Sequence, residues 1–177
     1  MTLKEIIKCD QEYYDSYPTK RKIKFLLTND HLYQVRKYMI FLRKEEHFFN
    51  KEGLFNRAIS FYYARKKNCL GNKLGFYILP NCVGKGCIIY HHGSIIIHGD
   101  AFIGEGCKLH GNNCIGNNGI DNKAPKLGKN VDIGFGAVIL GGVTIADNVK
   151  IGAGAVVVRD CHVEGATLVG VPAEIKK

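Results

Sequence analysis

Large aliphatic residues recur at every sixth position through the second half of this 177-residue chain. The series begins at Ile97, ends at Ile175 and is interrupted once, at Asp121. A period of six matches neither an α-helix nor a simple strand. Thirteen of fourteen positions follow it, which excludes chance spacing. They are Ile97, Ile103, Leu109, Ile115, Leu127, Ile133, Ile139, Ile145, Ile151, Val157, Val163, Val169 and Ile175.

A repeat this short cannot bury its apolar face alone, so successive coils must stack on one another. Residues 75–177 contain 19 of the 21 glycines, which supply left-handed backbone angles at corners with little strain. Side chains four positions after each aliphatic residue are usually small or β-branched, as at Ala101 and Val131. Three hexapeptides per coil would form a triangular prism of parallel strands, about five to six coils long. The sequence therefore predicts an all-β parallel β-helix over residues 75–177.

Residues 1–74 lack the six-residue period and read as a small α-helical segment. Residues 3–14 predict a short helix, and Pro18 separates it from the next helix. Leu32, Val35, Met39, Leu42 and Phe49 fit one face of a second helix, with an N-cap at Asn29-Asp30. A third helix is expected over 54–67, where Phe55, Ala58, Ile59 and Tyr62 form the apolar face and Gly71 is the stop.

The charge is concentrated in the helical segment, with 16 of the 25 Lys and Arg residues but only 8 of the 16 Asp and Glu residues. We interpret it as a solvated helical surface, because no zinc finger or RNA-binding motif indicates a nucleic-acid partner. Seven cysteines without a Cys-x-x-Cys pair predict reduced, buried thiols and no metal site. No apolar run is long enough to span a membrane, and the charged start of the chain predicts a cytoplasmic protein.

Two irregularities interrupt the repeat, and irregular positions in a solenoid are candidate functional sites. Val83, Ile89 and Ile95 keep the spacing of six but lie two residues out of phase with Ile97. This phase shift places His91 and His92 at a corner of the coil. The second irregularity is the polar stretch 117–126, which predicts a loop leaving the coil.

These features resemble the hexapeptide acyltransferases, and within them the serine O-acetyltransferase branch. The family pattern Ile-Asp-His-x-Thr-Gly matches residues 89–94, Ile-Tyr-His-His-Gly-Ser. The end of the chain, Gly170-Val171-Pro172-Ala173, matches the family's closing motif. The resemblance covers residues 75–177 and implies a left-handed β-helix that transfers an acetyl group from acetyl-CoA to a hydroxyl. The helical segment is shorter than that of true serine acetyltransferases.

The resemblance places the catalytic general base at His91, with His92 and His110 as weaker candidates. Imidazole suits this role because its pKa lies near neutrality. Tyr90 and Tyr77 occupy the two positions where the family has acidic residues, one of which orients the imidazole. A phenol or a backbone carbonyl must orient His91 here.

The loop motif Asp-Arg-His-Pro-Lys of the family is Asn122-Lys123-Ala124-Pro125-Lys126 in this chain. In the family, its Arg and His help to hold the charged groups of serine, and their loss argues against free serine as the acceptor. The sequence is more similar to relatives that acetylate sugars in surface polysaccharide synthesis. A serine acetyltransferase and a non-catalytic β-helix scaffold are the alternatives.

The resemblance also implies a donor site and an assembly. Acetyl-CoA would be held by backbone groups of late coils and by cations near the end of the chain. These positions are Gly136, Ala137, Ala153, Ala155, Arg159 and Lys176. The expected assembly is a homotrimer with sites between subunits, and a hexamer of two trimers is compatible with it. Zinc-binding β-helix relatives need a His-x-x-x-x-His pair, which does not follow His92 or His110.

Overall fold

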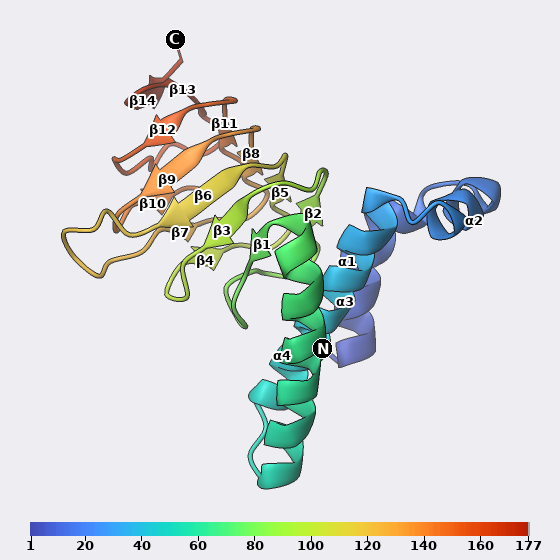
Figure 1. Ribbon diagram of the computed structural model, residues 1–177. Helices are drawn as coiled ribbons and strands as arrows, with labels where there is room; N and C mark the ends of the chain where they lie inside the picture. Colours follow the sequence, from blue (N-terminus) through green and yellow to red (C-terminus); the bar gives the residue numbers. More distant parts are fainter. Residues whose placement is uncertain (177) are drawn as a thin grey trace.

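The computed structural model describes residues 1–176, in which four helices precede fourteen short strands. The helices are α1 (Leu3–Asp15), α2 (Thr19–Leu27), α3 (His31–Phe49) and α4 (Leu54–Leu74). They form a bundle at one end of the β-helix, and the C-terminus lies at the other end (Figure 1). In the described part of the chain, no helix has the length and apolar character needed to cross a membrane.

Local sequence explains where the helices begin. Thr2 and Glu5 form a capping box at the start of α1, and the Asp30 side chain accepts a hydrogen bond from the Leu32 amide at the start of α3. The expected helices over 3–14 and 32–49 are therefore confirmed, whereas α2 was not predicted.

The predicted stop of the third helix at Gly71 is wrong. Helix α4 continues to Leu74 and ends at Gly75, whose φ of 79° is left-handed. Gly71 is instead a close-packing position, because a Cβ there would lie 2.7 Å from the Phe76 carbonyl oxygen and 3.1 Å from the Tyr38 ring.

Strands of successive coils stack into three sheets (Figure 1). The five-stranded sheet has the order β1-β3-β6-β9-β12, the three-stranded sheet β10-β7-β4 and the six-stranded sheet β14-β13-β11-β8-β5-β2. All pairings are parallel except that of β13 with β14. The strands are β1 (Phe76–Tyr77), β2 (Ile88–Ile89), β3 (Ile95–Ile97), β4 (Phe102–Ile103), β5 (Lys108–Leu109), β6 (Asn113–Gly116), β7 (Lys126–Leu127), β8 (Asp132–Ile133), β9 (Val138–Leu140), β10 (Thr144–Ile145), β11 (Lys150–Ile151), β12 (Val156–Val157), β13 (Thr167–Gly170) and β14 (Ala173–Ile175).

The six-residue period corresponds to the inward-facing positions of these strands. Ile97, Ile115 and Ile139 are paired in register through β3, β6 and β9, and all three are fully buried. The phase shift before Ile97 is also confirmed, because Ile89 pairs with Leu109 and both are buried. Residues 117–125 form the expected loop between β6 and β7, which stands out from the prism (Figure 1).

The predicted pattern fails in the last coil. Val163, Val169 and Ile175 are 55%, 39% and 48% exposed rather than buried. Cys161 and Leu168 take the inward positions, paired with Ile145 and Ile151. The last coil is shorter than the eighteen residues of a regular one, so the phase shifts again after Val157.

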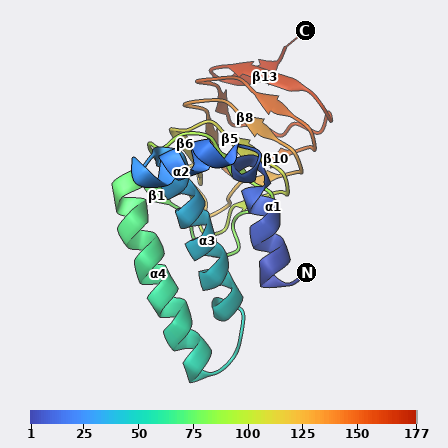
Figure 2. The ribbon, with the colours of Figure 1, turned by 90° about the vertical axis from the view of Figure 1, so that its right-hand side faces the viewer.

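The helices pack on the first coils through a buried set of charges. Arg43 Nε lies 2.6 Å from an Asp10 carboxylate oxygen, and its side chain also donates to the carbonyl oxygens of Val83 and Gly84. Lys67 pairs with Glu45 and donates to the Ile78 carbonyl oxygen. Helices α3 and α4 run side by side away from the prism (Figure 2). The bundle is therefore joined to the end of the β-helix by polar contacts as well as by apolar ones.

Candidate active site

The turns that lead from the six-stranded to the five-stranded sheet form one edge of the prism, which we call the histidine edge. It consists of residues 90–94, 110–112, 134–137 and 152–155, one turn from each coil. Both histidines of the corner motif, His91 and His92, are exposed there. The pairing of Ile89 with Leu109 places Gly111 one coil above His91 and Phe135 a further coil above.

Gly111 lies between His91 and Phe135. A Cβ at Gly111 would lie 3.5 Å from the His91 Cβ and 3.4 Å from the Phe135 ring. The φ of 114° at Gly111 also favours glycine. The Phe135 ring thus packs over Gly111 next to His91, which remains exposed.

A third histidine, His31 at the start of α3, lies against both histidines of the corner. Its ring centroid is 5.8 Å from that of His91, with the planes 24° apart, and 5.4 Å from that of His92. Asp30 Oδ1 lies 3.4 Å from His31 Nδ1. Sequence reasoning missed His31, and only its position just after the N-cap of a helix set it apart.

Tyr90 is half-buried and does not take the role that a carboxylate has at this position in the family. Its ring packs edge-on against Tyr13 of α1 at 5.2 Å and against His110 at 4.7 Å. Burial, with help from the nearby Asp132 carboxylate, raises the pKa of Tyr90, so the phenol stays protonated at neutral pH. It can act only as a neutral hydrogen-bonding group.

His110, one coil above Tyr90, has a carboxylate partner. Its Nε2 lies 2.8 Å from Asp132 Oδ1. Within residues 1–176, no hydrogen-bond partner is found for the side chains of His91 and His92. The expected substitute partner of His91 is therefore not identified.

Tyr77 does not lie on the histidine edge. It projects from β1 on the outer face of the five-stranded sheet, next to Ile96, and is 58% exposed. Together with Leu79, His98 and Asn117 it lines a shallow groove of about 440 Å³. The two tyrosines that replace the family's acidic residues are thus on different surfaces of the prism.

The predicted donor-binding residues separate into three places. Gly136 and Ala153 are accessible on the histidine edge, whereas Ala137 and Ala155 on the same edge point into the core. Arg159 lies across the five-stranded sheet, where it lines a groove of about 520 Å³ with the loop residues Asn118 and Lys123. Lys176 follows β14 at the far end of the prism, and its amide donates to the Thr167 carbonyl oxygen.

The loop that departs from the family motif is ordered by its own side chains. Asn118 Oδ1 accepts from the amides of Ile120 and Asp121, while Ala124 and Pro125 are buried. The buried Ala124 holds the position of the family's histidine. Among residues 1–176, no group of three or more His, Cys, Asp or Glu side chains is arranged to hold a metal ion.

Comparisons with known proteins agree with this architecture. Residues 124–159 match the family described as bacterial transferase hexapeptide (six repeats). No match was found among curated proteins. The solved serine acetyltransferase of Neisseria gonorrhoeae in complex with serine has a TM-score of 0.70 and 25% sequence identity, covering 97% of this chain and 68% of that chain.

Two further structures are similar. Soybean serine acetyltransferase, as apoenzyme, has a TM-score of 0.76 and 23% identity, with 98% of this chain and 69% of that chain covered. A serine acetyltransferase in complex with CoA has a TM-score of 0.65 and 25% identity, covering 81% of this chain and 57% of that chain. The soybean similarity shows the fold alone.

The repeats and these neighbours imply the left-handed β-helix with N-terminal helices that the sequence predicted. The chain spans about two thirds of the length of the first two structures. Taken together, the hexapeptide repeats and the serine acetyltransferase-like structure identify the protein as an acyltransferase, as the sequence predicted.

Proposed function

We propose that this protein transfers the acetyl group of acetyl-CoA to a hydroxyl, with His91 as the general base. The observation that supports this most directly is the exposed His91 imidazole at the corner of the coil, stacked against His31. A base must reach the proton it removes, and the His91 side chain is accessible to solvent. The positions of Gly136 and Ala153 on the same edge support a donor site two to three coils above it.

His91 would take the proton of the acceptor hydroxyl as its oxygen bonds to the acetyl carbonyl carbon. It would return that proton to the sulfur as the carbon–sulfur bond breaks, so that His91 ends neutral. Acid–base help of this kind changes rates by about 10²–10⁴. Acetyl-CoA supplies the activated thioester. The His31 ring, stacked on His91, would restrict the imidazole to one orientation in place of the missing carboxylate.

The residues of the histidine edge fit the donor. Ala153 is exposed, and a Cβ at the neighbouring Gly154 would meet no atom within 4 Å. Strand spacing near 4.8 Å places this turn about 14 Å from His91 along the prism, so the pantetheine arm would run along the edge. The predicted cations for the phosphates, Arg159 and Lys176, are exposed but lie away from this edge. Ala137 and Ala155 would contribute only through their backbone.

Two acceptors are supported by different observations. The neighbours are serine acetyltransferases, one of them solved with serine bound, which favours serine. The residues of this chain favour another hydroxyl, because Ala124, Tyr77 and Tyr90 cannot pair with the charged groups of an amino acid. We propose a sugar hydroxyl, in surface polysaccharide synthesis, with serine as the alternative.

A homotrimer would complete the site. The shallow groove beside Tyr77 and the histidine edge are open surfaces on one chain, and small-molecule sites are normally concave. A neighbouring prism would provide the missing wall, and a hexamer joined through the helical bundles remains compatible. In this proposal residues 1–74 are a separate helical unit attached to the acyltransferase domain, 75–177.

His110 is a second candidate for the base. Its 2.8 Å contact with Asp132 is the arrangement that orients a catalytic imidazole. Its ring lies 4.7 Å from that of Tyr90 and its Nε2 is already engaged by Asp132, whereas His91 stands at the position of the family motif, which is why we favour His91.

The proposal is tested by measuring CoA release with acetyl-CoA and a panel of acceptors. The panel should contain serine, neutral sugars, amino sugars and nucleotide-linked sugars. We expect turnover with a sugar and little with serine. Serine turnover equal to that of an established serine acetyltransferase would overturn the sugar assignment, and no turnover with any acceptor would overturn the reaction.

A further inference from the structure

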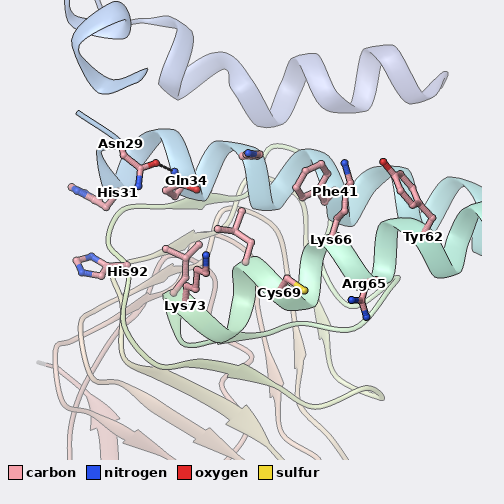
Figure 3. Close-up of a pocket in the computed structure, with 13 residues that line it drawn as sticks. Asn29, His31, Gln34, Phe41, Tyr62, Arg65, Lys66, Cys69, Lys73 and His92 are labelled. Carbon is pink, nitrogen blue, oxygen red and sulfur yellow. Dashed lines mark hydrogen bonds between the residues drawn. The ribbon is translucent and has the colours of Figure 1, made fainter. Parts of the chain in front are cut away.

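A groove of about 910 Å³ lies between α3 and α4 and ends at the histidine edge. Residues of both helices face it, and His31 and His92 lie together at one end (Figure 3). Its volume lies within the range of small-molecule sites. Neither the catalytic residues nor the donor residues proposed above account for it, apart from His92 at its end.

The groove has an unusual charge distribution. Four cations line it, Lys37, Arg65, Lys66 and Lys73, and no Asp or Glu does. None of the four forms an ion pair within residues 1–176. Of the twelve other Lys and Arg residues in the helical segment, only Lys22, Arg36, Arg43 and Lys67 form ion pairs in the part of the chain that the structure describes. The groove is therefore set apart by four cations that line one cavity without a carboxylate, and not by the absence of ion pairs alone. Unmatched cations that converge on one cavity repel each other, and an anion there would remove that cost.

The groove also presents aromatic rings. Phe41 of α3 and Tyr62 of α4 line it, and Tyr62 is half exposed. Lys66 Nζ lies 4.8 Å from the Tyr62 ring centroid and 5.8 Å from that of Phe41. A planar base could stack on these rings while its phosphates contact the cations, because Tyr62 lies about one helical turn from Arg65 and Lys66 on α4. Arginine adds a planar fork suited to phosphate oxygens.

The direction of the groove connects it with the reaction. Arg65 and Lys73 are eight residues apart on α4, which is about 12 Å of helix axis at 1.5 Å per residue. Lys73 lies near the end occupied by His92, and Arg65 and Tyr62 lie further along the groove (Figure 3). A ligand held by its phosphates would extend one end towards His92 and its neighbour His91.

We propose that this groove binds the nucleoside diphosphate part of the acceptor, so that the acetylated hydroxyl belongs to a sugar carried on a nucleoside diphosphate. This inference rests on the proposed acetyl transfer to a hydroxyl and names the class of its acceptor. The diphosphate contacts Lys66, Lys73 and Arg65, the base stacks on Tyr62 and Phe41, and the sugar reaches the histidine corner.

Other ligands share part of this chemistry, so the experiment must distinguish them from a nucleoside diphosphate. A lipid-linked diphosphate has the phosphates without the base, and CoA has a diphosphate and a base but belongs to the donor site. Binding is therefore measured by calorimetry on the full-length protein with UDP, inorganic pyrophosphate, farnesyl diphosphate and CoA. We expect UDP to bind more tightly than pyrophosphate or farnesyl diphosphate, and a saturating concentration of CoA to leave its affinity unchanged.

Variants locate the site. Lys66→Gln and Arg65→Gln should each weaken UDP binding about tenfold, the effect of about 1.4 kcal/mol, and Tyr62→Ala should weaken UDP but not pyrophosphate. Lys4→Gln on α1 removes the same charge outside the groove and should change nothing. Equal melting temperatures for these variants, whose side chains are exposed, would show that folding is unaffected.

Three results would overturn the assignment. They are competition between CoA and UDP, tighter binding of farnesyl diphosphate than of UDP, and equal UDP affinity in Lys66→Gln and Lys4→Gln. Because binding is measured without an acetyl donor, it is independent of turnover. If UDP binds as expected but another acceptor is acetylated and no nucleotide-linked sugar is, the groove does not hold the acceptor and this inference fails while the proposed reaction stands. If UDP binds and no acceptor is acetylated, the proposed reaction fails. If neutral sugars are acetylated and UDP does not bind, only the groove assignment fails.

Discussion

At the scale of single residues, the histidine corner gives the sharpest prediction. His91→Ala should reduce acetyl transfer about 10²–10⁴-fold, because it removes the proposed general base. The fold should not change, since His91 is exposed. His92→Ala should have a smaller effect, because His92 lines the groove beside α4, whereas His91 lies next to Gly111 on the histidine edge. The measurement is CoA release with the best acceptor of the panel.

His110→Ala is the control that separates the two candidate bases. Loss of activity in His110→Ala with full activity in His91→Ala would assign the base to the Asp132-linked histidine. Circular dichroism melting curves of the three variants would confirm that a lost activity is not a lost fold.

Thiol reactivity follows from burial in a predictable way. Burial raises the pKa of Cys107 to about 11 and that of Cys87 well above its ordinary value. Because the thiolate is the reactive form, both residues should resist maleimide at pH 8, whereas the exposed Cys69 should react. Mass spectrometry of digested protein gives the labelled positions. All should label equally in urea, and labelling of Cys87 in the folded protein at the rate of Cys69 would contradict the burial.

Single residues were predictable where a motif surrounded them and not where the fold brought them together. His91 and His92 were identified from the phase shift next to Ile89. His31 lies sixty positions earlier in the sequence, and its contact with the corner depends on how α3 docks on the first coil. Ala137 and Ala155 were chosen as small residues against a ligand, but the same small size also serves the core.

At the scale of elements, the connection between bundle and prism depends on one buried arginine. The side chain of Arg43 is 4% exposed and that of Asp10 is 1% exposed. Asp10 also accepts from the Gly86 amide, so α1, α3 and the first coil meet at this pair. Arg43→Met should reduce the free energy of unfolding by about 3–5 kcal/mol, because a buried carboxylate is left without its partner. Urea denaturation measures it.

An exposed ion pair on the same bundle serves as the comparison. Lys22 lies 3.8 Å from Asp15, with side chains 40% and 50% exposed. Lys22→Met should reduce the free energy of unfolding by no more than about 1 kcal/mol, since solvent screens such pairs. If Arg43→Met and Lys22→Met reduce the free energy of unfolding equally, the Arg43 pair does not hold the bundle to the β-helix.

Elements were predictable in proportion to the regularity of their pattern. The period of six determined the strands from Ile97 to Val157, because each coil repeats the same inward positions. It failed after Val157, where a shortened coil moved Cys161 and Leu168 inward. Helix α4 was located correctly at its start, yet Phe55 and Ala58 of its predicted apolar face are exposed. When apolar residues lie on several faces of a helix, the sequence does not show which face contacts the rest of the protein.

At the scale of the whole molecule, one chain leaves apolar surface uncovered beside its proposed site. Tyr77 and Ile96 lie exposed on the five-stranded sheet, and Phe135 is half exposed on the histidine edge. Neighbouring exposed apolar side chains, such as those of Tyr77 and Ile96, are typical of an interface. A triangular prism has faces that three copies can present to one another in closed symmetry, which supports the proposed trimer.

The trimer prediction can be tested by placing a charge on that surface. Ile96→Glu puts a carboxylate in the groove next to Tyr77, where burial against a neighbouring subunit would cost several kcal/mol. We expect analytical ultracentrifugation to show a trimer for the unmodified chain and a shift to monomer for Ile96→Glu, with activity lost alongside. Leu27→Glu on α2, where the side chain is 79% exposed against 45% for Ile96 and lies on no sheet face, should remain trimeric. A monomeric unmodified chain that still transfers acetyl groups would show that one prism forms the complete site, and the open surface beside Tyr77 would then need another explanation than a neighbouring copy.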